Sequence, residues 1–570
     1  MPPSIAVLAS RWAPDSAGRR FLWQVGPIAV VHLAALIVLL QTELLFSVPH
    51  MLSFVMVWGL LNFVWLAVFR RPGVSAVLSF AILATLVLLS ALKYKVLWQT
   101  VTFVDVMIIE PSAVGYLLAI IPGLSGYVLL GVAATAAFLA LLWRLDPFRL
   151  PRLAAVAGAL GCLVGIGGIS AVYPFNPEHI WFPNNHVSNF ARTGVDAVAE
   201  FIRKGYMESD AVATDRLKTI ADASCDVGRK PPHIIVVHDE SAFDIRNAPN
   251  ITVPTGYGRH FRSFDGKHRD FVVEVAGGPS WYTEYNVFAG LSARTFGKFA
   301  YFVTRIAAGR VERGLPRALR RCGYRTSSLY PAHGAFMAAK SFQASTGVQN
   351  FFDMRSMRAR DVEPDSFYYD QVARMFERER AGGPTFFFIY LSANHFPWDY
   401  RFREDLTPGW KTLGNQPLVE EYLRRQTLGM QHYQQFLERL RREFPGERFM
   451  IVRYGDHQPD FATTILEPSL KDDAIVQRLM AYDPKYYTTY YAIDAINYRP
   501  VNITSTHDAI EAPYLPLVTL ESAGVPLDAS FAEQKKIFER CRGLFYSCAG
   551  GAEARRFNRL LIDAGLIKGL

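Results

Sequence analysis

Long apolar stretches dominate the first third of the chain. A helix needs about 20 apolar residues to cross the hydrocarbon core of a bilayer. Five stretches approach or reach that length, at residues 27–45, 51–69, 74–92, 127–143 and 153–172. The pattern therefore predicts an α-helical membrane anchor of five spans within residues 1–173.

Arginines flank these stretches in three places, within residues 11–20, at 70–71 and within 144–152. If all five stretches span, the three basic segments fall on one side, which the positive-inside rule makes the cytoplasm. Lys93 and Lys95 lie on the opposite side and weaken the asymmetry slightly. Five spans place everything after residue 173 outside the cytoplasm.

Residues 101–121 are also apolar, but they contain Asp105, Glu110 and Pro111. A sixth span here would move the rest of the chain into the cytoplasm, against the charge rule. We therefore interpret this segment as interfacial or re-entrant. The five spans hold almost no ionisable residues, which favours an anchor over a transport path.

The pattern changes after residues 174–226, which we interpret as a juxtamembrane linker. Short apolar runs then alternate with amphipathic helical stretches such as residues 418–444. Runs of this kind are typical of a parallel sheet that helices cover on both faces. Residues 227–570 are therefore predicted to form an α/β domain with a mainly parallel sheet. The runs read HIIVVHDES, FVVEVAGG, TFFFIYLSANH and FMIVRYGDH.

The composition agrees with a chain that has one very apolar part and one part of ordinary polarity, since 51% of residues are hydrophobic and 19% are charged. The net charge of +9 comes from dispersed lysines and arginines, so no basic patch predicts nucleic-acid binding. Cys162 lies in an apolar stretch. The other four cysteines allow three pairings, among which Cys541 with Cys548 is our first choice.

Each of the four apolar runs ends in residues that can carry chemistry. The first leads into Glu240, the second into Ser280 after Gly-Gly-Pro, the third into His395, and the fourth into Asp456 and His457. Ligands of open α/β sheets bind beyond the carboxyl ends of the strands. One such residue could be a helix cap, but four strands with this ending predict a single crevice.

Glu240, Asp456 and His457 offer two carboxylates and one imidazole. This set suits Mn²⁺ or Zn²⁺, and suits Mg²⁺ less because Mg²⁺ prefers oxygen. A fourth ligand could be the hydroxyl of Ser280, whose pKa a metal would lower, producing a nucleophile. The alternatives are an ordinary turn at Ser280 and a helix cap with a surface histidine at Asp456-His457.

The order VVHDES, GGPSWYTEY, NHFPW and YGDH after five spans resembles the lipoteichoic acid synthase and phosphoglycerol transferase group. That group belongs to the alkaline phosphatase/sulfatase superfamily. The resemblance implies that an enzyme hydroxyl attacks the phosphodiester of phosphatidylglycerol and that diacylglycerol leaves. A covalent glycerophosphoryl-enzyme then passes its group to an acceptor hydroxyl.

By this resemblance Glu240, Ser280, Asp456 and His457 match the metal-binding and nucleophile positions of the family. His395 matches a histidine that contacts the phosphoglycerol group or transfers a proton. A structural hydrogen bond across its loop is the alternative role for His395.

The sequence also departs from the family. A Trp and an Arg that contact the head group are missing from the corresponding stretch, AHGAFMAAKSFQ. His333 or Lys340 could replace these contacts, or both could be solvated. Asp239 is an extra carboxylate beside Glu240 and a third candidate for substrate contact. Its alternative roles are a hydrogen-bond partner of the metal ligands or a cap.

Together with the membrane spans, this resemblance implies a transferase that moves phosphoglycerol from phosphatidylglycerol to a cell-envelope glycan. The predicted location is a bacterial inner or plasma membrane, with the catalytic domain in the periplasm. A phosphoethanolamine transferase acting on a lipid or glycan is the first alternative, and a non-catalytic membrane scaffold is the second. Sulfate ester hydrolysis is disfavoured because Ser280 is not followed by x-Pro-x-Arg. The acceptor stays open.

Overall fold

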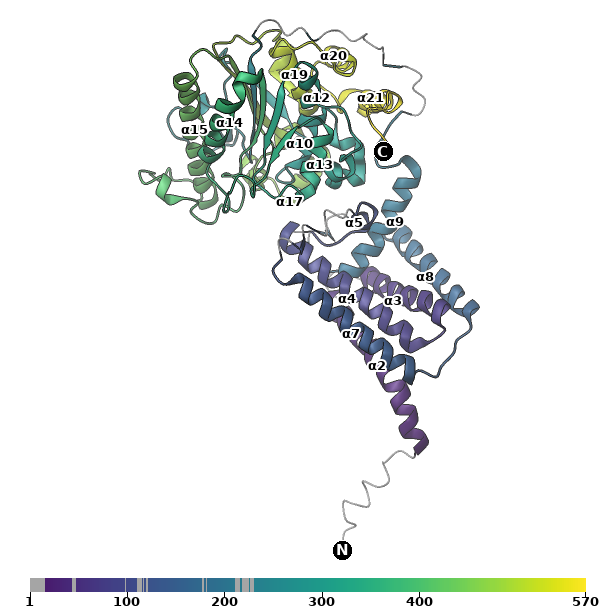
Figure 1. Cartoon of the computed structure of the whole chain (residues 1–570). Coiled ribbons are helices and arrows are strands. Elements are labelled where there is room, and N and C mark those ends of the chain that lie inside the picture. Colours follow the sequence, from purple (N-terminus) through teal and green to yellow (C-terminus); the bar gives the residue numbers. More distant parts are fainter. Residues whose placement is uncertain are drawn as a thin grey trace. The chain divides into compact units, whose positions relative to one another are not determined.

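The chain forms two compact units in the computed structural model, Met1–Arg203 and Lys204–Leu570 (Figure 1). The division falls inside the segment 174–226, because helix α9 (His186–Lys204) packs almost entirely with the first unit. The described residues are 16–43, 48–97, 99–109, 115, 117–118, 121–176, 179–180, 182–210, 216–217, 225 and 230–570.

The first unit contains five helices in its described part that are long and apolar enough to cross a membrane. The predicted helical anchor of five spans is confirmed in this respect. Helix α3 packs against both α4 and α8, and α4 also packs against α2 and α7. The helices are α2 (Ser16–Thr42), α3 (Val48–Phe69), α4 (Pro72–Leu97), α7 (Leu124–Leu145) and α8 (Arg152–Val172).

One of the two charged residues in the apolar segment 101–121 has a partner in the described structure. Asp105 lies on the short helix α5 (Phe103–Met107), and its Oδ2 is 2.8 Å from Nζ of Lys93. Each charge therefore offsets the other where α4 ends. Glu110 and Pro111 lie outside the described residues, so the interfacial interpretation of the whole segment stays a prediction.

Helix α9 is attached to the ends of α2 and α3 by buried polar contacts. Glu43, just after α2, accepts hydrogen bonds from the backbone N of Val187 at 2.9 Å and from Ser188 Oγ at 2.5 Å. Ser188 Oγ also lies 2.8 Å from Nδ1 of His50, on α3. Because Glu43, His50 and Ser188 are all fully buried, these contacts fix the start of α9.

An eight-stranded sheet organises the second unit, in the order β4-β3-β5-β1-β6-β7-β2-β8. Every neighbouring pair is parallel except those that involve β7. The predicted α/β domain with a mainly parallel sheet is therefore confirmed. The strands are β1 (His233–Asp239), β2 (Asp270–Val272), β3 (Arg325–Leu329), β4 (Asn350–Phe352), β5 (Thr385–Tyr390), β6 (Phe449–Gly455), β7 (Thr488–Ile496) and β8 (Ala509–Glu511).

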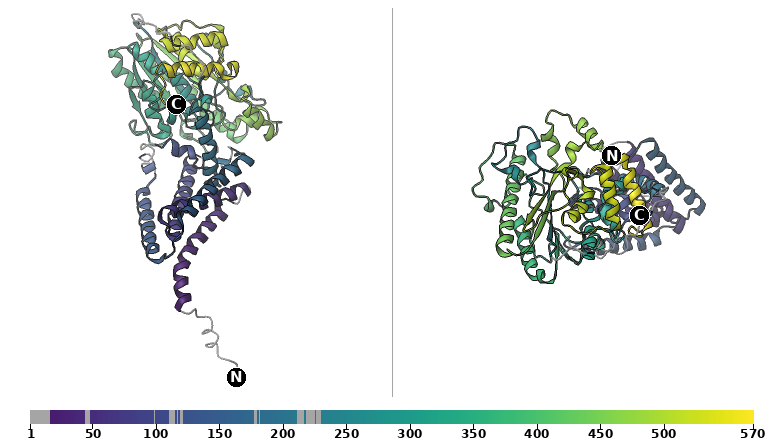
Figure 2. Two further views of the ribbon diagram at one scale, coloured as in Figure 1. Left: turned by 90° about the vertical axis from the view of Figure 1, so that its right-hand side faces the viewer. Right: turned by 90° about the horizontal axis from the view of Figure 1, so that it is seen from above.

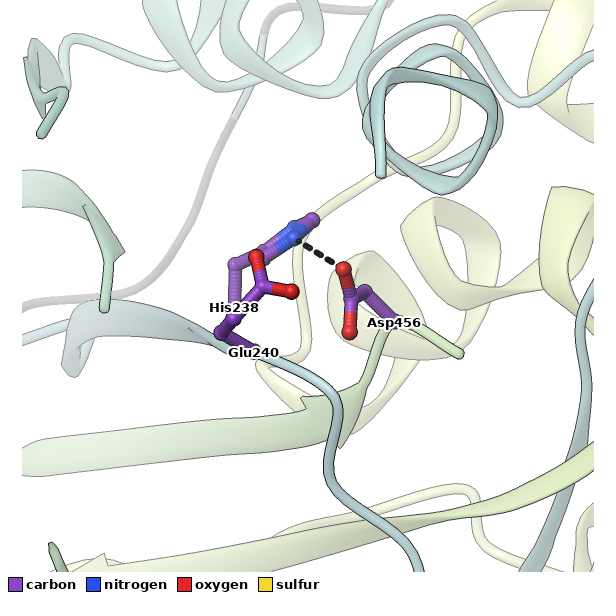
Figure 3. Close-up of side chains that lie close together, drawn as sticks. All are labelled: His238, Glu240 and Asp456. Atoms are coloured by element: carbon purple, nitrogen blue, oxygen red, sulfur yellow. Dashed lines mark hydrogen bonds and ion pairs between the residues drawn. The ribbon is translucent and has the colours of Figure 1, made fainter. Parts of the chain in front are cut away.

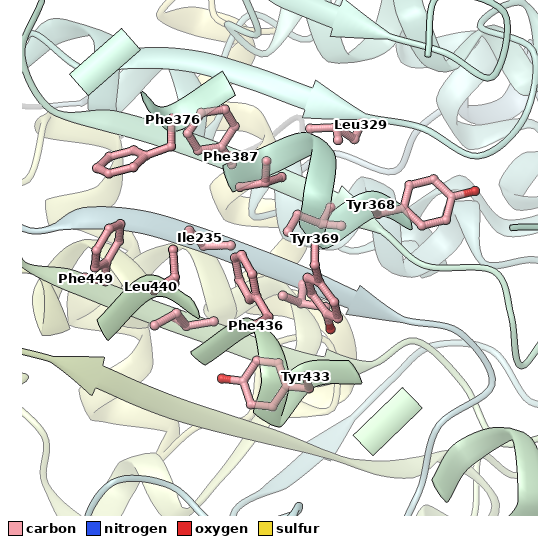
Figure 4. Close-up of a cluster of buried hydrophobic side chains, with 14 of the residues drawn as sticks. Ile235, Leu329, Tyr368, Tyr369, Phe376, Phe387, Tyr433, Phe436, Leu440 and Phe449 are labelled. Carbon is pink, nitrogen blue, oxygen red and sulfur yellow. The ribbon is translucent and has the colours of Figure 1, made fainter. Parts of the chain in front are cut away.

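Helices cover both faces of this sheet (Figure 2). On one face, Ile235 and Val237 of β1 join a core of side chains from α14 (Asp365–Glu379) and α15 (Pro417–Glu443) (Figure 4). On the other face, Phe288 of α10 (Trp281–Ala289) lies 4.5 Å, between ring centroids, from Phe388 of β5. Successive side chains of a strand point to opposite faces of the sheet, and they therefore pack against different helices.

The remaining helices of the second unit lie around these layers. They are α11 (Val303–Ala307), α12 (Leu315–Arg321), α13 (Ala339–Ser345), α16 (Ala462–Leu466), α17 (Asp472–Met480), α18 (Pro484–Tyr487), α19 (Leu515–Ser522), α20 (Ala529–Cys541) and α21 (Ala552–Asp563). Cys541 pairs with Cys548, which confirms our first choice, and Cys225 pairs with Cys322. Cys162 is free and buried.

Candidate metal and nucleophile site

The carboxyl ends of β1 and β6 bring two carboxylates to the same level. The strands are paired in parallel with Asp239 opposite Gly455, so Glu240 and Asp456 follow side by side. A Cβ at Gly455 would lie 1.7 Å from the carbonyl oxygen of Ala242. Glycine is therefore required where the two chain segments approach each other just before Asp456.

Ser280 reaches the two carboxylates from the turn that precedes α10. Gly277 in this turn has a φ of 59°, and a Cβ there would lie 2.8 Å from Cα of Asp460. The turn is thus pressed against the loop that follows β6. Oγ of Ser280 lies 3.2 Å from Oε2 of Glu240 and 3.3 Å from Nε2 of His457.

His457 and Asp456 complete the group. Nε2 of His457 lies 3.4 Å from Oε1 of Glu240 and 3.4 Å from Oδ2 of Asp456. Its Nδ1 lies 2.7 Å from the carbonyl oxygen of Gln458, which orients the ring. The structure therefore brings together all four residues that the sequence predicts as metal ligands and nucleophile. Their roles stay proposals.

Burial and neighbouring charges shift the pKa values of this group in opposite directions. Burial alone would lower the pKa of His457, but the negative charges of Asp456 and Glu240 raise this pKa to about 9. Burial alone would raise the pKa of Asp456, but His457 and His238 hold it below its usual value. Two adjacent buried carboxylates thus need positive charge close by.

The donor set fits a divalent metal. Glu240, Asp456 and His457 supply two carboxylates and one imidazole, all buried, and Ser280 supplies a hydroxyl that is only 6% exposed. Such mixed oxygen and nitrogen sets hold divalent transition metals in proteins. A metal ion would also provide the positive charge that the two carboxylates require.

His238 belongs to the same cluster, although our metal set from the sequence omits it. Potential ligand atoms of His238, Glu240 and Asp456 lie within 4.8 Å of one another (Figure 3). The sequence does contain a signal for His238. Side chains two residues apart along a strand share a face, and His238 precedes Glu240 by two residues.

Asp239 does not join this cluster. It has the opposite orientation on β1, where its Oδ2 accepts a hydrogen bond of 2.6 Å from Tyr490 and lies 3.5 Å from Nε2 of His260. The side chain of Asp239 thus lies beside Tyr490 and His260, and a role in substrate contact stays a prediction. Sequence adjacency is misleading here because neighbouring strand residues point to opposite faces.

His395 lies in the exposed loop that follows β5. Its Nδ1 is 2.7 Å from the carbonyl oxygen of Phe396, so Nδ1 carries a proton and donates it there. The second ring nitrogen, Nε2, takes no part in this hydrogen bond. Arg425 of α15 donates to the carbonyl oxygens of His395, Pro397 and Tyr400 at 2.9–3.0 Å. Sequence reasoning missed this buried arginine, because it is remote along the chain from the loop it holds.

His333 and Lys340 lie after β3. The backbone N of Ala335 donates to Nδ1 of His333 at 3.2 Å, and Lys340 is exposed at the start of α13. Between them, Phe336 contacts Trp281, with 5.8 Å between ring centroids. The segment therefore adjoins the residue next to Ser280, while substrate contacts of His333 and Lys340 stay predictions.

Comparison with known proteins found one matching family model. The model of the sulfatase family matches residues 277–487. No curated protein matches the sequence.

Three solved structures illustrate the similarity. The lipoteichoic acid synthase LtaP from Listeria monocytogenes is 16% identical, with a TM-score of 0.39 over 53% of this chain and 74% of that one. The phosphoglycerol transferase GacH from Streptococcus pyogenes is 16% identical, with a TM-score of 0.47 over 64% and 97%. The phosphoethanolamine transferase EptA from Neisseria meningitidis is 13% identical, with a TM-score of 0.38 over 83% and 95%.

The segment that matches the sulfatase model contains Ser280, which closes the turn before α10. It also contains Asp456 and His457, which directly follow β6. The match to the sulfatase family model therefore covers the part of the second unit that contains Ser280, Asp456 and His457.

Proposed function

We propose that the chain is a membrane-bound phosphotransferase that moves a phospholipid-derived head group through a covalent intermediate on Ser280. The observation that carries the proposal is the position of the Ser280 hydroxyl, within 3.3 Å of both Glu240 and His457. Glu240 and His457 follow strands β1 and β6, and Ser280 begins helix α10. The same chain has five described helices that are long and apolar enough to cross a membrane.

Ser280 acts as the nucleophile. Its hydroxyl donates toward Oε2 of Glu240, and it occupies the N-cap position of the nine-residue helix α10. A helix N-terminus favours negative charge, both on the nucleophile and on a phosphate beside it. Held by Glu240, Ser280, Asp456 and His457, a divalent metal would lower the pKa of the hydroxyl and offset phosphate charge. Mn²⁺ is our first choice, with Zn²⁺ or Mg²⁺ as alternatives.

In the first half-reaction the oxygen of Ser280 forms a bond to phosphorus, and the bond from phosphorus to the diacylglycerol oxygen breaks. The hydroxyl proton passes to a neighbouring base, and His395 protonates the leaving oxygen. In the second half-reaction His395 takes the proton of an acceptor hydroxyl, whose oxygen forms a bond to phosphorus. The bond from phosphorus to the oxygen of Ser280 breaks, and the neighbouring base returns its proton to that oxygen. The exposed position of His395 suits contact with two successive substrates.

The donor we propose is phosphatidylglycerol, and the acceptor is a glycan of the bacterial cell envelope on the periplasmic side. A lipid donor leaves the bilayer at a cost of about 0.8 kcal/mol per buried CH₂. A catalytic domain joined to membrane helices therefore works beside its donor rather than extracting it into water.

One observation favours phosphoethanolamine as a second candidate head group. Trp281, next to Ser280, makes edge-to-face contacts with Tyr301 and Phe336, at 5.2 and 5.8 Å between ring centroids. Aromatic rings attract ammonium groups through the negative charge of their faces. Ethanolamine carries such a group, whereas glycerol does not.

The covalent adduct tests the proposal. The detergent-solubilised protein is incubated with phosphatidylglycerol or phosphatidylethanolamine, quenched in acid, and measured by intact mass and peptide mass spectrometry. A glycerophosphoryl group on Ser280 supports the first candidate, and a phosphoethanolamine group supports the second. If neither lipid modifies Ser280 and no diacylglycerol forms, the transferase proposal is wrong and the scaffold alternative gains support.

A further inference from the structure

His238 is held on both sides by the neighbouring strands. It is fully buried near the end of β1, with Tyr390 of β5 and Tyr454 of β6 as its register partners. The ring of His238 lies 4.0 Å, between centroids, from that of Tyr390. The orientation of the imidazole is therefore fixed by packing before any ligand binds.

Both ring nitrogens of His238 have a partner. Nδ1 lies 2.8 Å from the hydroxyl of Tyr454. Nε2 lies 3.1 Å from Oδ2 of Asp456 (Figure 3). One proton order satisfies both contacts. The hydroxyl of Tyr454 donates to Nδ1, and the proton on Nε2 donates to the carboxylate. The reverse order would direct a nitrogen lone pair at the oxygen of Asp456.

Both carboxylate oxygens of Asp456 accept hydrogen bonds. Oδ1 accepts from the backbone N of Ser241 at 2.7 Å and of His457 at 2.8 Å. Oδ2 accepts from His238 and also faces Nε2 of His457 at 3.4 Å. The backbone thus anchors one oxygen, and His238 sets the direction of the other.

We infer that His238 is a positioning residue: through its Nε2–H it fixes Oδ2 of Asp456, and Tyr454 keeps the proton of His238 on that nitrogen. This inference rests on the proposed metal site of Glu240, Ser280, Asp456 and His457. In this role His238 acts on the metal through Asp456, and the relay Tyr454–His238–Asp456 is the support behind the ligand.

The proximity of His238 to Glu240 and Asp456 allows a competing role as a direct metal ligand. The two roles differ in what they predict for substitution. A positioning donor can be replaced by another N–H at the same place, such as the amide of glutamine, without changing the ligands of the metal. A direct ligand, once removed, changes the coordination sphere itself.

Metal titration of the full chain in detergent separates these roles. Metal-stripped wild type, His238→Ala, His238→Gln and Tyr454→Phe are titrated with Mn²⁺ for affinity and with Co²⁺ for its visible absorption spectrum. His233→Gln is the matched control, because His233 is a buried histidine at the opposite end of the same strand.

We expect His238→Ala to weaken Mn²⁺ binding by roughly 10- to 100-fold, the usual loss when a hydrogen-bond partner of a metal ligand is removed. His238→Gln should recover most of this affinity, and Tyr454→Phe should lose less than His238→Ala. At saturating Co²⁺ the spectra of all variants should match the wild type, and His233→Gln should bind as wild type does.

A changed Co²⁺ spectrum in saturated His238→Ala or His238→Gln would overturn the inference in favour of a direct ligand. Wild-type affinity in His238→Ala would overturn it by showing no role at all, while leaving the proposed metal site intact. If wild type itself binds neither ion, the metal site and this inference fall together. Should His238→Ala not fold, His238→Gln and Tyr454→Phe decide the question, since both preserve side-chain volume closely.

Discussion

Oγ of Ser280 lies 3.2 Å from Oε2 of Glu240, although 40 residues separate them in the chain. Glu240 follows β1, and Ser280 closes the glycine-containing turn before α10. Because α10 covers the face of the sheet on which Glu240 emerges, the helix start and the strand end meet. This contact joins the proposed nucleophile to a proposed metal ligand.

Ser280→Ala should abolish the covalent adduct and lower lipid turnover by roughly a thousandfold or more, the scale seen when a catalytic nucleophile is removed. Diacylglycerol release from phosphatidylglycerol vesicles measures this. Ser280→Thr keeps a hydroxyl and should retain measurable turnover. Because three metal ligands remain in Ser280→Ala, it should still bind Mn²⁺, with reduced affinity. Full activity in this variant would rule out the mechanism.

Removal of divalent metal should inactivate the protein and lower its Tm. Without a metal, the buried pair Glu240 and Asp456 loses the positive charge that offsets it, and metal binding to the folded state alone adds stability. Activity and Tm are measured after chelation and after addition of Mn²⁺, Zn²⁺ or Mg²⁺ in turn. We expect Mn²⁺ to restore both most completely. Unchanged activity in protein shown to be metal-free would contradict the proposed site.

Much of the fold follows from local patterns in the sequence. The five apolar stretches and the runs at β1, β5 and β6 differ in period and length, and each pattern predicts its element. Strand-end positions likewise predict Glu240 and Asp456, because parallel strands place their carboxyl ends at one edge. These inferences need no knowledge of which helix covers which strand.

Other features depend on contacts that local patterns do not contain. Arg425 holds the loop of His395 from a helix 30 residues later. His238 and Asp239 are adjacent polar residues, yet only His238 enters the cluster because the strand alternates. The fixed start of α9 depends on Glu43, which lies 144 residues earlier than Val187. Such pairings follow from tertiary packing.

Glu43→Ala should destabilise the first unit. The substitution leaves the buried N–H of Val187 without its acceptor and removes the hydrogen bond that Glu43 accepts from the hydroxyl of Ser188. An unsatisfied buried polar group costs about 1–3 kcal/mol. Thermal unfolding of the full chain in detergent should show a lower Tm for Glu43→Ala and an intermediate Tm for Glu43→Gln, which keeps one oxygen. Equal Tm values for both variants and wild type would show that these contacts do not stabilise α9.

The last prediction concerns Asp365, a buried carboxyl at the start of α14. Burial, together with the negative charge of Asp239, raises the pKa of Asp365 from 3.8 to about 8. The folded protein therefore keeps a proton on Asp365 that the unfolded chain releases above about pH 4. Its contribution to stability is complete below pH 4 and is lost as the pH rises toward 8.

Asp365→Asn cannot ionise, so it should remove this pH dependence while keeping an oxygen acceptor. The Tm of the variant minus that of wild type should increase steadily from pH 5 to pH 8, corresponding to a few kcal/mol at the upper end. Asp370→Asn, on the same helix but in an exposed ion pair with Arg439, is the control and should give a nearly constant difference. Parallel Tm profiles of Asp365→Asn and wild type would mean that Asp365 is already ionised in the folded protein. In that case its burial beside Asp239 would require a bound cation rather than a proton.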